Sequence, residues 1–169
     1  ITFGGGGHSS EILKSLSTKG KLIAIDCDTD AHKNKIDDNR LNLIHGNYRY
    51  MINYLEYLGI DKIDGILADF GVSSHQFDVE NRGFSYRFGG KLDMRMNKEQ
   101  SLTAAEILNN YEEDALLSVF KKYSDINNSK KLISLITSYR KNAPFVTIPD
   151  FLSVIETVVP VHNSNKYLS

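Results

Sequence analysis

Residues 1–26 read ITFGGGGHSSEILKSLSTKGKLIAID and combine two kinds of periodicity. Residues 1–3 look like the end of a buried strand, and four consecutive glycines, Gly4 to Gly7, follow at once. Apolar residues then recur at helical spacing over residues 9–18, and Gly20 separates them from the apolar run 21–26. This alternation predicts a strand, a glycine-rich turn, a helix and a second buried strand.

The same alternation continues along the next part of the chain. We predict a helix over residues 29–36, a strand over 41–45, a helix over 48–58 and a fourth strand over 63–69. Strands and helices that alternate at this spacing are typical of parallel βαβ units, and right-handed crossovers favour a doubly wound sheet. The predicted fold class is therefore α/β with a Rossmann-like parallel sheet.

The pattern changes after residue 70. Residues 70–100 are rich in Gly, Ser, Arg and aromatic residues without a clear period, which predicts a long functional loop. Helical periodicity then returns in four segments, 103–110, 112–123, 127–141 and 149–158. We therefore predict two domains, a Rossmann-like domain over residues 1–100 and a helical domain over residues 101–169.

The predicted sheet has an edge without a neighbouring strand, which either the later helices cover or further residues complete, and we favour the second. Four parallel strands form only half of a doubly wound sheet, and such sheets bury both faces and manage their edges. No further strand is predicted after residue 70, and the chain opens on Ile1, inside a predicted strand. We therefore expect the sheet to be incomplete in this chain and further residues to belong to it.

Composition narrows the class of protein. Twenty Lys and Arg residues against 21 Asp and Glu residues give a net charge of -1, which excludes nucleic-acid binding driven by bulk charge but not by a local patch. The single cysteine, Cys27, excludes an internal disulfide and suggests a reducing, cytoplasmic location. No apolar run is long enough to span a membrane.

We expect no metal site. No Cys/His cluster has the spacing of a zinc site, and Ala31 stands where a calcium loop starting at Asp26 needs glycine.

The glycine turn and Asp26 together predict a cofactor site. Glycines after a strand let the backbone approach a ligand, and Asp26 ends the second strand, where a doubly wound fold places the carboxylate that binds ribose. The dinucleotide fingerprint fits poorly, because Ser9 or Ser10 stands at its third glycine. The alternatives are S-adenosylmethionine, which has a ribose but no pyrophosphate, NAD, and a plain tight turn.

Asp69 follows the fourth predicted strand, so it is expected in the same crevice as the glycine turn. A carboxylate there can orient an exocyclic amine for attack on a methyl group, or it can simply cap the local backbone. Asp69 is our candidate catalytic residue.

The segment from residue 82 to residue 98 interleaves aromatic and basic side chains. It holds five basic residues and one acid, a local net charge of +4. Aromatic faces stack on unpaired bases and cations meet phosphates, so the segment predicts an RNA-binding surface. A hairpin that buries its aromatic residues on one face is the structural alternative. The candidate RNA-binding residues are Arg82, Phe84, Tyr86, Arg87, Lys91 and Arg95.

Several runs of this sequence resemble the MraW family. They are Thr2 to Ser9, Ala24 to Asp26, His45 to Asn47, Asp64 to Leu67, Asp69 to Ser74, Arg82 to Ser85 and Leu92 to Met96. The resemblance is strong over residues 1–125 and weaker beyond, and the joint pattern of the long loop is its most specific part.

The resemblance implies a function. It implies an enzyme that uses S-adenosylmethionine to methylate N4 of a cytosine in 16S ribosomal RNA of the small subunit, with a Rossmann-like domain interrupted by an inserted helical domain. It places the cofactor contacts on Gly6, Gly7, His8, Asp26, Tyr48, Asp69 and Gln76.

The sequence departs from the family pattern at a few positions. Tyr48 stands where Phe is usual, His75 where Pro is frequent, and Gly89-Gly90-Lys91 where Asp-Gly-Pro is common. The family also continues with further strands after its inserted helices. Two other functions are kept open, an NAD-dependent oxidoreductase and a truncated RNA-binding domain without turnover. The sequence does not determine the oligomeric state, and a homodimer is left open.

Overall fold

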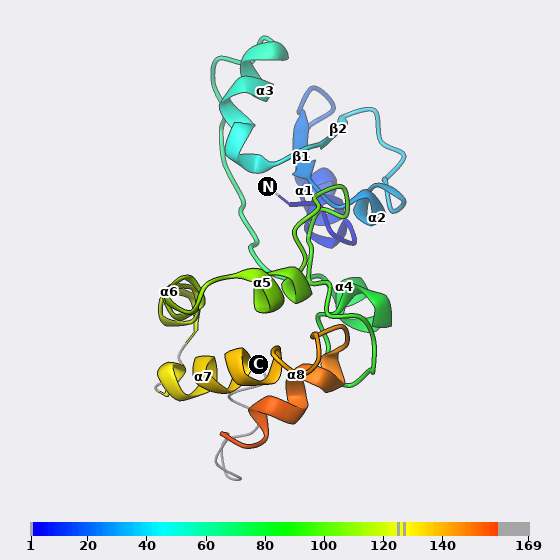
Figure 1. The fold of residues 1–169 in the computed structure, drawn as a ribbon. Helices are drawn as coiled ribbons and strands as arrows, with labels where there is room; N and C mark the ends of the chain where they lie inside the picture. Colours follow the sequence, from blue (N-terminus) through cyan, green and yellow to red (C-terminus); the bar gives the residue numbers. More distant parts are fainter. Residues whose placement is uncertain (1, 125, 127, 159–169) are drawn as a thin grey trace. The chain divides into compact units, whose positions relative to one another are not determined.

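The computed structural model describes residues 2–124, 126 and 128–158, and its ribbon is drawn in Figure 1. The chain divides into two compact units. The first, unit 1, comprises Ile1–His75 and Met96–Glu99, and the second, unit 2, comprises Gln76–Arg95 and Gln100–Ser169. The two units interleave along the chain, whereas the sequence predicts one boundary near residue 100. Among the described residues, no helix is both long and apolar enough to cross a bilayer.

Unit 1 is built on a parallel pair of strands. β1 (Leu22–Asp26) pairs with β2 (Leu41–His45) in a register that sets Leu22 opposite Leu41 and Asp26 opposite His45. The preceding helix α1 (Gly7–Ser15) and the connecting helix α2 (Thr29–His32) supply apolar side chains to a small core. That core contains Phe3, Leu13, Ala24, Ala31 and Leu41. The predicted βαβ arrangement of this part is confirmed.

A third helical segment follows β2. A 3-10 turn, η1 (Tyr48–Tyr50), leads into α3 (Met51–Tyr57), so the predicted helix over residues 48–58 is confirmed apart from its first turn. The side chain of Asn47 caps this start by accepting a hydrogen bond from Arg49 N at 2.9 Å.

Two predicted strands are wrong. Residues 63–69 form no strand, and Ile63, Ile66 and Leu67 are exposed. Thr2 and Phe3 are not in a strand either, and Ile1 lies outside the described residues. The physical reason is pairing, because a strand needs a neighbour for its N–H and C=O groups. Within the described residues, β1 and β2 pair only with each other. The fold class α/β holds, with a smaller sheet than predicted.

Unit 2 is mainly helical, and its helices are short. Two short elements lie in the predicted loop, α4 (Ser74–Asp78), which starts in unit 1, and η2 (Glu80–Arg82). The main helices are α5 (Ala104–Asn110), α6 (Glu113–Tyr123), α7 (Ser129–Tyr139) and α8 (Ile148–Ile155). They confirm the four helices that the periodicity predicts, although residues 125 and 127 lie outside the described residues. Figure 1 shows α7 beside α6 and α8, and it packs against both.

Local sequence explains where these helices begin. Thr103 and Glu106 form a capping box at α5, and Thr147 and Asp150 form one at α8, which also carries a proline in its first turn. Hydrogen bonding to the Thr147 backbone lowers the pKa of Asp150, which keeps this cap ionised. The apolar side chains of α7 lie in the core. Leu132, Ile133 and Ile136 are among the most deeply buried side chains.

Candidate functional site

The glycine turn has a conformation that depends on glycine. Gly4 and Gly6 have φ angles of 54° and 79°, in the left-handed region. Gly6 N donates to Phe3 O at 2.8 Å, and Gly6 O accepts from Ser10 N at 2.8 Å, so Gly6 both closes the turn and caps α1. A Cβ on Gly6 would stand 3.0 Å from the Phe3 ring. The turn therefore tolerates no side chain at Gly6 without strain.

Asp26 holds this turn in place. Its Oδ2 accepts hydrogen bonds from Phe3 N and Gly4 N, both at 2.9 Å, and its Oδ1 accepts one from Asp28 N at 2.9 Å. Sequence reasoning assigned Asp26 to a ribose and missed this role. A carboxylate has about four acceptor positions, so contact with a ribose hydroxyl and support of the turn are compatible. The clue available in the sequence was a glycine turn whose amide groups need acceptors close to a strand end.

His8 and Asp69 are brought together. His8 is the second residue of α1, and its Nδ1 lies 3.4 Å from Asp69 Oδ2. Both side chains are about two-thirds exposed, at 66% and 63%. The backbone at Asp69 is also held, because Thr2 Oγ1 donates to Asp69 O at 2.5 Å. The sequence prediction that Asp69 lies beside the glycine turn agrees with this contact.

Tyr48 has an aromatic neighbour that sequence reasoning missed. Its ring centroid lies 5.2 Å from that of Phe70, at an interplanar angle of 43°. Both rings are exposed, Tyr48 at 46% and Phe70 at 63%. Phe70 directly follows Asp69, and all three residues belong to unit 1. Gln76, the remaining predicted cofactor contact, is buried in α4 and belongs to unit 2.

Two histidines lie at the same end of the sheet. His32 Nε2 is 3.2 Å from Asp26 O, His45 Nε2 is 3.3 Å from Cys27 O, and the two rings meet edge to face at 5.1 Å. In the part of the chain that the structure describes, no three His, Cys, Asp or Glu side chains gather to hold a metal ion.

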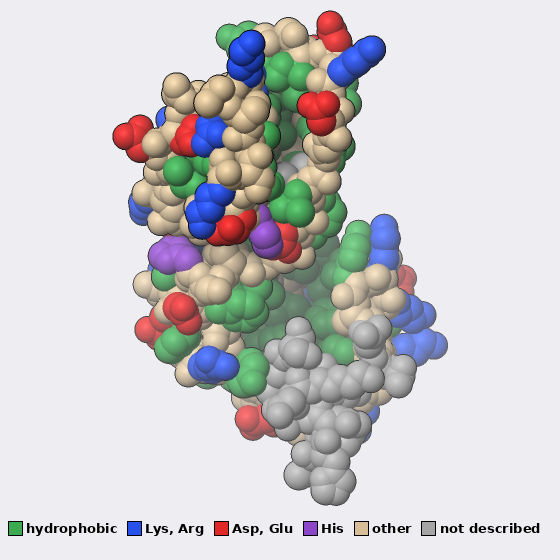
Figure 2. All heavy atoms as spheres, turned by 180° about the vertical axis from the view of Figure 1, so that it is seen from behind, with side chains coloured by type: hydrophobic (Ala, Val, Ile, Leu, Met, Phe, Trp, Pro, Cys, Tyr) green, Lys and Arg blue, Asp and Glu red, His purple; other side chains and the backbone are tan. Residues whose placement is uncertain are grey.

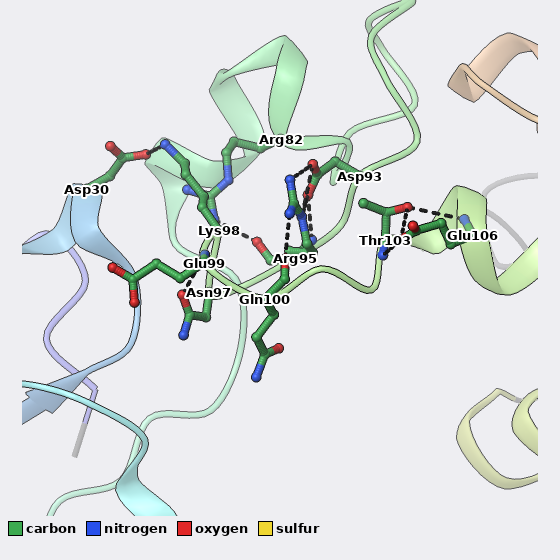
Figure 3. Close-up of polar contacts among 10 residues, drawn as sticks. All are labelled: Asp30, Arg82, Asp93, Arg95, Asn97, Lys98, Glu99, Gln100, Thr103 and Glu106. Atoms are coloured by element: carbon green, nitrogen blue, oxygen red, sulfur yellow. Dashed lines mark hydrogen bonds and ion pairs between the residues drawn. The ribbon is translucent and has the colours of Figure 1, made fainter.

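A charged cluster surrounds Asp30, the second residue of α2, and no pattern in the sequence predicts it. Asp30 is buried, with 8% of its side chain exposed. Lys33 Nζ lies 2.7 Å from its Oδ1, Lys98 Nζ pairs with its Oδ2, and His75 Nε2 lies 3.9 Å from Oδ2. Figure 3 shows Lys98 reaching Asp30. Hydrogen bonds from Lys33 and Lys98 hold the pKa of Asp30 well below its usual range.

Within unit 2, two of the predicted RNA-binding arginines support the loop. Arg82 is only 3% exposed, and its Nη2 donates to Arg95 O at 2.9 Å. Arg95 in turn forms a bidentate pair with Asp93, at 3.0 Å from Nε to Oδ1 and 2.7 Å from Nη2 to Oδ2. Burial opposes ionisation of Asp93, but the hydrogen bonds from Arg95 outweigh it and lower the pKa of that carboxyl.

The loop is also anchored to the helices. Leu92 is buried in the helical core, Leu92 N donates to Val146 O at 3.0 Å, and Ile148 N donates to Gly90 O at 2.9 Å. Lys91 and Thr147 form an isolated antiparallel bridge. These bonds explain why residues 76–95 cluster with the helices.

The remaining predicted RNA-binding residues lie nearer the surface. Tyr86, Arg87 and Lys91 are exposed, and Phe84 is half-buried with its ring 5.8 Å from the Arg82 guanidinium carbon. The alternative of a hairpin that buries the aromatic residues is wrong, because residues 82–90 contain no strand and Tyr86 and Phe88 are exposed. Figure 2 shows acidic and basic side chains interspersed on the face of the protein that it draws.

Unit 1 suits an adenosine-containing cofactor with an amino-acid tail. A Cβ added to Gly5 or Gly7 would meet no atom within 4 Å, so the turn leaves space beside its backbone. The first turn of α1 presents amide N–H groups that suit a carboxylate, and Asp26 offers acceptor positions for hydroxyl groups. His8 and Tyr48 add a polar and an aromatic side chain.

Comparison with known sequences decides the family. The sequence pattern described as the MraW methylase family matches residues 1–168. The chain belongs to the MraW methylase family.

Curated relatives agree with this assignment. The MraW chain is 50% identical over 169 residues to a protein of Christiangramia forsetii named ribosomal RNA small subunit methyltransferase H, covering 100% of this chain and 56% of that relative. Proteins of the same name from Phocaeicola vulgatus and Flavobacterium psychrophilum are 48% and 46% identical, covering 99% and 100% of this chain and 55% and 58% of those relatives. The chain thus spans little more than half the length of these relatives.

Proposed function

We propose that this chain is the part of an S-adenosylmethionine-dependent methyltransferase that binds the cofactor and contacts the RNA, and that the enzyme methylates N4 of a cytosine in 16S ribosomal RNA of the small subunit. The observation that carries the proposal is the glycine turn held by Asp26, with Asp69 beside it, in a chain that belongs to the MraW family over residues 1–168.

In this proposal Gly6, Gly7, His8, Asp26, Tyr48, Asp69 and Gln76 contact the cofactor. The bound cofactor supplies a methyl group on a positively charged sulfur. The amides of the glycine turn and the start of α1 hold its amino-acid tail, Asp26 accepts hydrogen bonds from its ribose, and Tyr48 packs against its adenine ring.

Asp69 is the proposed catalytic residue. The lone pair of a cytosine amine is delocalised into the ring, so the amine is a poor nucleophile and its orientation matters most. The Asp69 carboxylate accepts a hydrogen bond from this amine and aims its nitrogen at the methyl carbon. With the cofactor bound, the exposed Asp69–His8 pair would be suited to accept the proton that the amine nitrogen loses when it is methylated.

The substrate contacts belong to the loop in unit 2. Tyr86, Arg87 and Lys91 are exposed and suit stacking on bases and pairing with phosphates. Phe84 contributes a half-buried ring, while Arg82 and Arg95 act mainly by holding the loop. The proposed partner is 16S ribosomal RNA within the small subunit in the cytoplasm. Light scattering in solution decides whether the chain also forms a homodimer.

The architecture is part of the same proposal. Residues 1–100 are proposed as a Rossmann-like cofactor-binding domain with its substrate loop over 70–100, and residues 101–169 as a helical domain inserted into it. The parallel strands β1 and β2 and the separate helical core of unit 2 support this division.

Calorimetric titration of this chain with S-adenosylhomocysteine, with NAD as the control ligand, tests the proposal. Saturable binding of S-adenosylhomocysteine alone is expected, and labelled-methyl transfer to small subunits is the next measurement. Binding of NAD alone would overturn the proposal in favour of an oxidoreductase, an alternative that family membership does not support. RNA binding without cofactor binding would instead favour a domain that does not turn over.

A further inference from the structure

Three basic side chains from separate parts of unit 1 meet around one carboxylate. Lys33 ends the α2 turn, His75 lies in α4, and Lys98 lies in the segment Met96–Glu99, yet all three reach Asp30. Lys33 and Lys98 carry two positive charges against the one negative charge of Asp30, so these three side chains have a net charge of +1. The Asp30 carboxylate therefore gathers more positive charge than it neutralises.

The basic groups of this cluster face solvent while the acid does not. The side chains of Lys33, His75 and Lys98 are 75%, 53% and 41% exposed, whereas that of Asp30 is 8% exposed. The Lys33 ammonium has three N–H donors, and its bond to Asp30 uses one. An incoming anion thus meets the cationic groups and not the carboxylate, which serves to fix their positions.

The cluster is connected to the same end of the sheet as the glycine turn. α2 starts three residues after Asp26, and its cap residue Asp28 accepts a hydrogen bond from Asp30 N at 3.0 Å. Asp28 N in turn donates to Asp26, the residue that holds the glycine turn. Two hydrogen bonds, from Asp30 N to Asp28 and from Asp28 N to Asp26, therefore link the cluster to the proposed cofactor site.

We propose that Lys33, His75 and Lys98 form a binding site for a backbone phosphate of the RNA substrate, with Asp30 as the residue that positions them. The inference rests on the proposed function, because it takes RNA as the ligand. It adds a contact on unit 1 to those proposed on the loop of unit 2. A phosphate bound here helps to hold the RNA strand close to the glycine turn and α1, where His8 contacts Asp69.

The effect of replacing Lys33 on RNA binding distinguishes a phosphate site from a purely structural ion pair. An ion pair whose lysine is 75% exposed contributes little to folding stability. Replacing Lys33 is therefore expected to leave the urea midpoint nearly unchanged, whether or not the site binds phosphate. Its effect on RNA binding then separates the two roles.

The test is binding of a fluorescein-labelled, 12-nucleotide single-stranded RNA with a central cytosine, measured by anisotropy between 50 and 300 mM KCl. Lys33→Gln and His75→Gln are compared with wild type and with the matched control Lys14→Gln. Lys14 is also an exposed lysine paired with an acid three residues before it, Glu11, at 2.6 Å, but that acid is exposed. Both lysine variants thus remove one positive charge and one ion pair of the same sequence spacing.

The proposal expects Lys33→Gln to weaken RNA binding about fivefold at 0.1 M salt and to lower the slope of log K against log salt by about 0.7, the effect of one phosphate contact on a single strand. His75→Gln is expected to weaken binding in the same direction, and Lys14→Gln to match wild type. Equal affinities and slopes for Lys33→Gln and Lys14→Gln would overturn the phosphate site but leave the proposed function standing.

Absence of RNA binding by the wild type would also overturn the phosphate site. Titration of the same preparation with S-adenosylhomocysteine then shows whether the proposed function falls with it. If the preparation still binds S-adenosylhomocysteine, the proposed methyltransferase function stands. If it does not, both the phosphate site and the proposed function are overturned.

Discussion

Asp26 and Gly4 are 22 residues apart, yet the Asp26 carboxylate accepts a hydrogen bond from the Gly4 amide at 2.9 Å. The same oxygen accepts a second bond from Phe3 N. The end of β1 therefore fixes the shape of the glycine turn before any ligand arrives. A preformed turn reduces the entropy cost of binding, because its backbone is already ordered.

Asp26→Ala is expected to weaken binding of S-adenosylhomocysteine by about 1–3 kcal/mol, since it removes both the support of the turn and the acceptor for the ribose. Hydrogen exchange at Phe3 and Gly4 should accelerate in the absence of ligand, which a role in ribose binding alone does not predict. The measurements are calorimetric titration and amide exchange, with Asp61→Asn, at an exposed acid of unit 1, as the control. Unchanged affinity and exchange would remove Asp26 from the site.

Gly6→Ala is expected to strain the turn, because Gly6 has a φ of 79° and its new Cβ would lie 3.0 Å from the Phe3 ring. A left-handed non-glycine residue costs about 1–2 kcal/mol, and the urea midpoint and the cofactor affinity should both fall. Gly5→Ala is the matched control, since its Cβ meets no atom within 4 Å. Equal stability of the two variants would show that the left-handed turn is not needed.

Substitutions in the loop of unit 2 should distinguish residues that contact RNA from residues that support the structure of the loop. The double variant Arg87→Gln, Lys91→Gln removes two exposed cations, so RNA affinity and its salt slope should fall while stability is retained. Arg82→Gln removes a buried side chain that donates to Arg95 O, so the free energy of unfolding should fall by about 1–3 kcal/mol. Denaturation and RNA anisotropy check both expectations. A stable Arg82→Gln variant with weakened RNA binding would reverse the assigned roles.

Stability should depend on pH through Asp38. Side-chain hydrogen bonds from Arg40, at 2.7 Å and 3.0 Å, lower the pKa of Asp38 to about 2. This value lies below the unfolded value of about 3.9, so the contribution is present above pH 3.9 and is lost as the pH falls towards 2. Urea denaturation between pH 5 and pH 2 should therefore show a smaller acid loss in Asp38→Asn than in wild type.

The exposed neighbour Asp37 provides the control for that series. Asp37→Asn should follow the wild-type pH profile, because the Arg40 bonds are intact. A profile of Asp38→Asn that coincides with that of wild type would show that the Arg40 pair does not contribute to acid stability.

Local sequence was enough for most of the helices. The apolar spacing of α7 and the Thr103 and Thr147 caps are short-range features, so they could be read before the fold was known. Residues 63–69 show the limit of this reasoning. Their apolar character suits a buried strand, but strand formation depends on a paired neighbour, and the described residues provide none.

Some features of the proposed site could likewise be read from the sequence, and others only from the tertiary structure. The sequence alone determined the α/β class and the glycine turn, because each follows from residue type and short-range spacing. It also predicted Asp26, Asp69 and the basic aromatic loop as parts of the site, although the strand expected before Asp69 does not form. Only the tertiary structure decided that Asp26 supports the turn, that Arg82 is buried, and that Lys98 meets Asp30 from 68 residues away. Such contacts depend on which segments pack together, and packing joins residues whose separation along the chain carries no periodic signal.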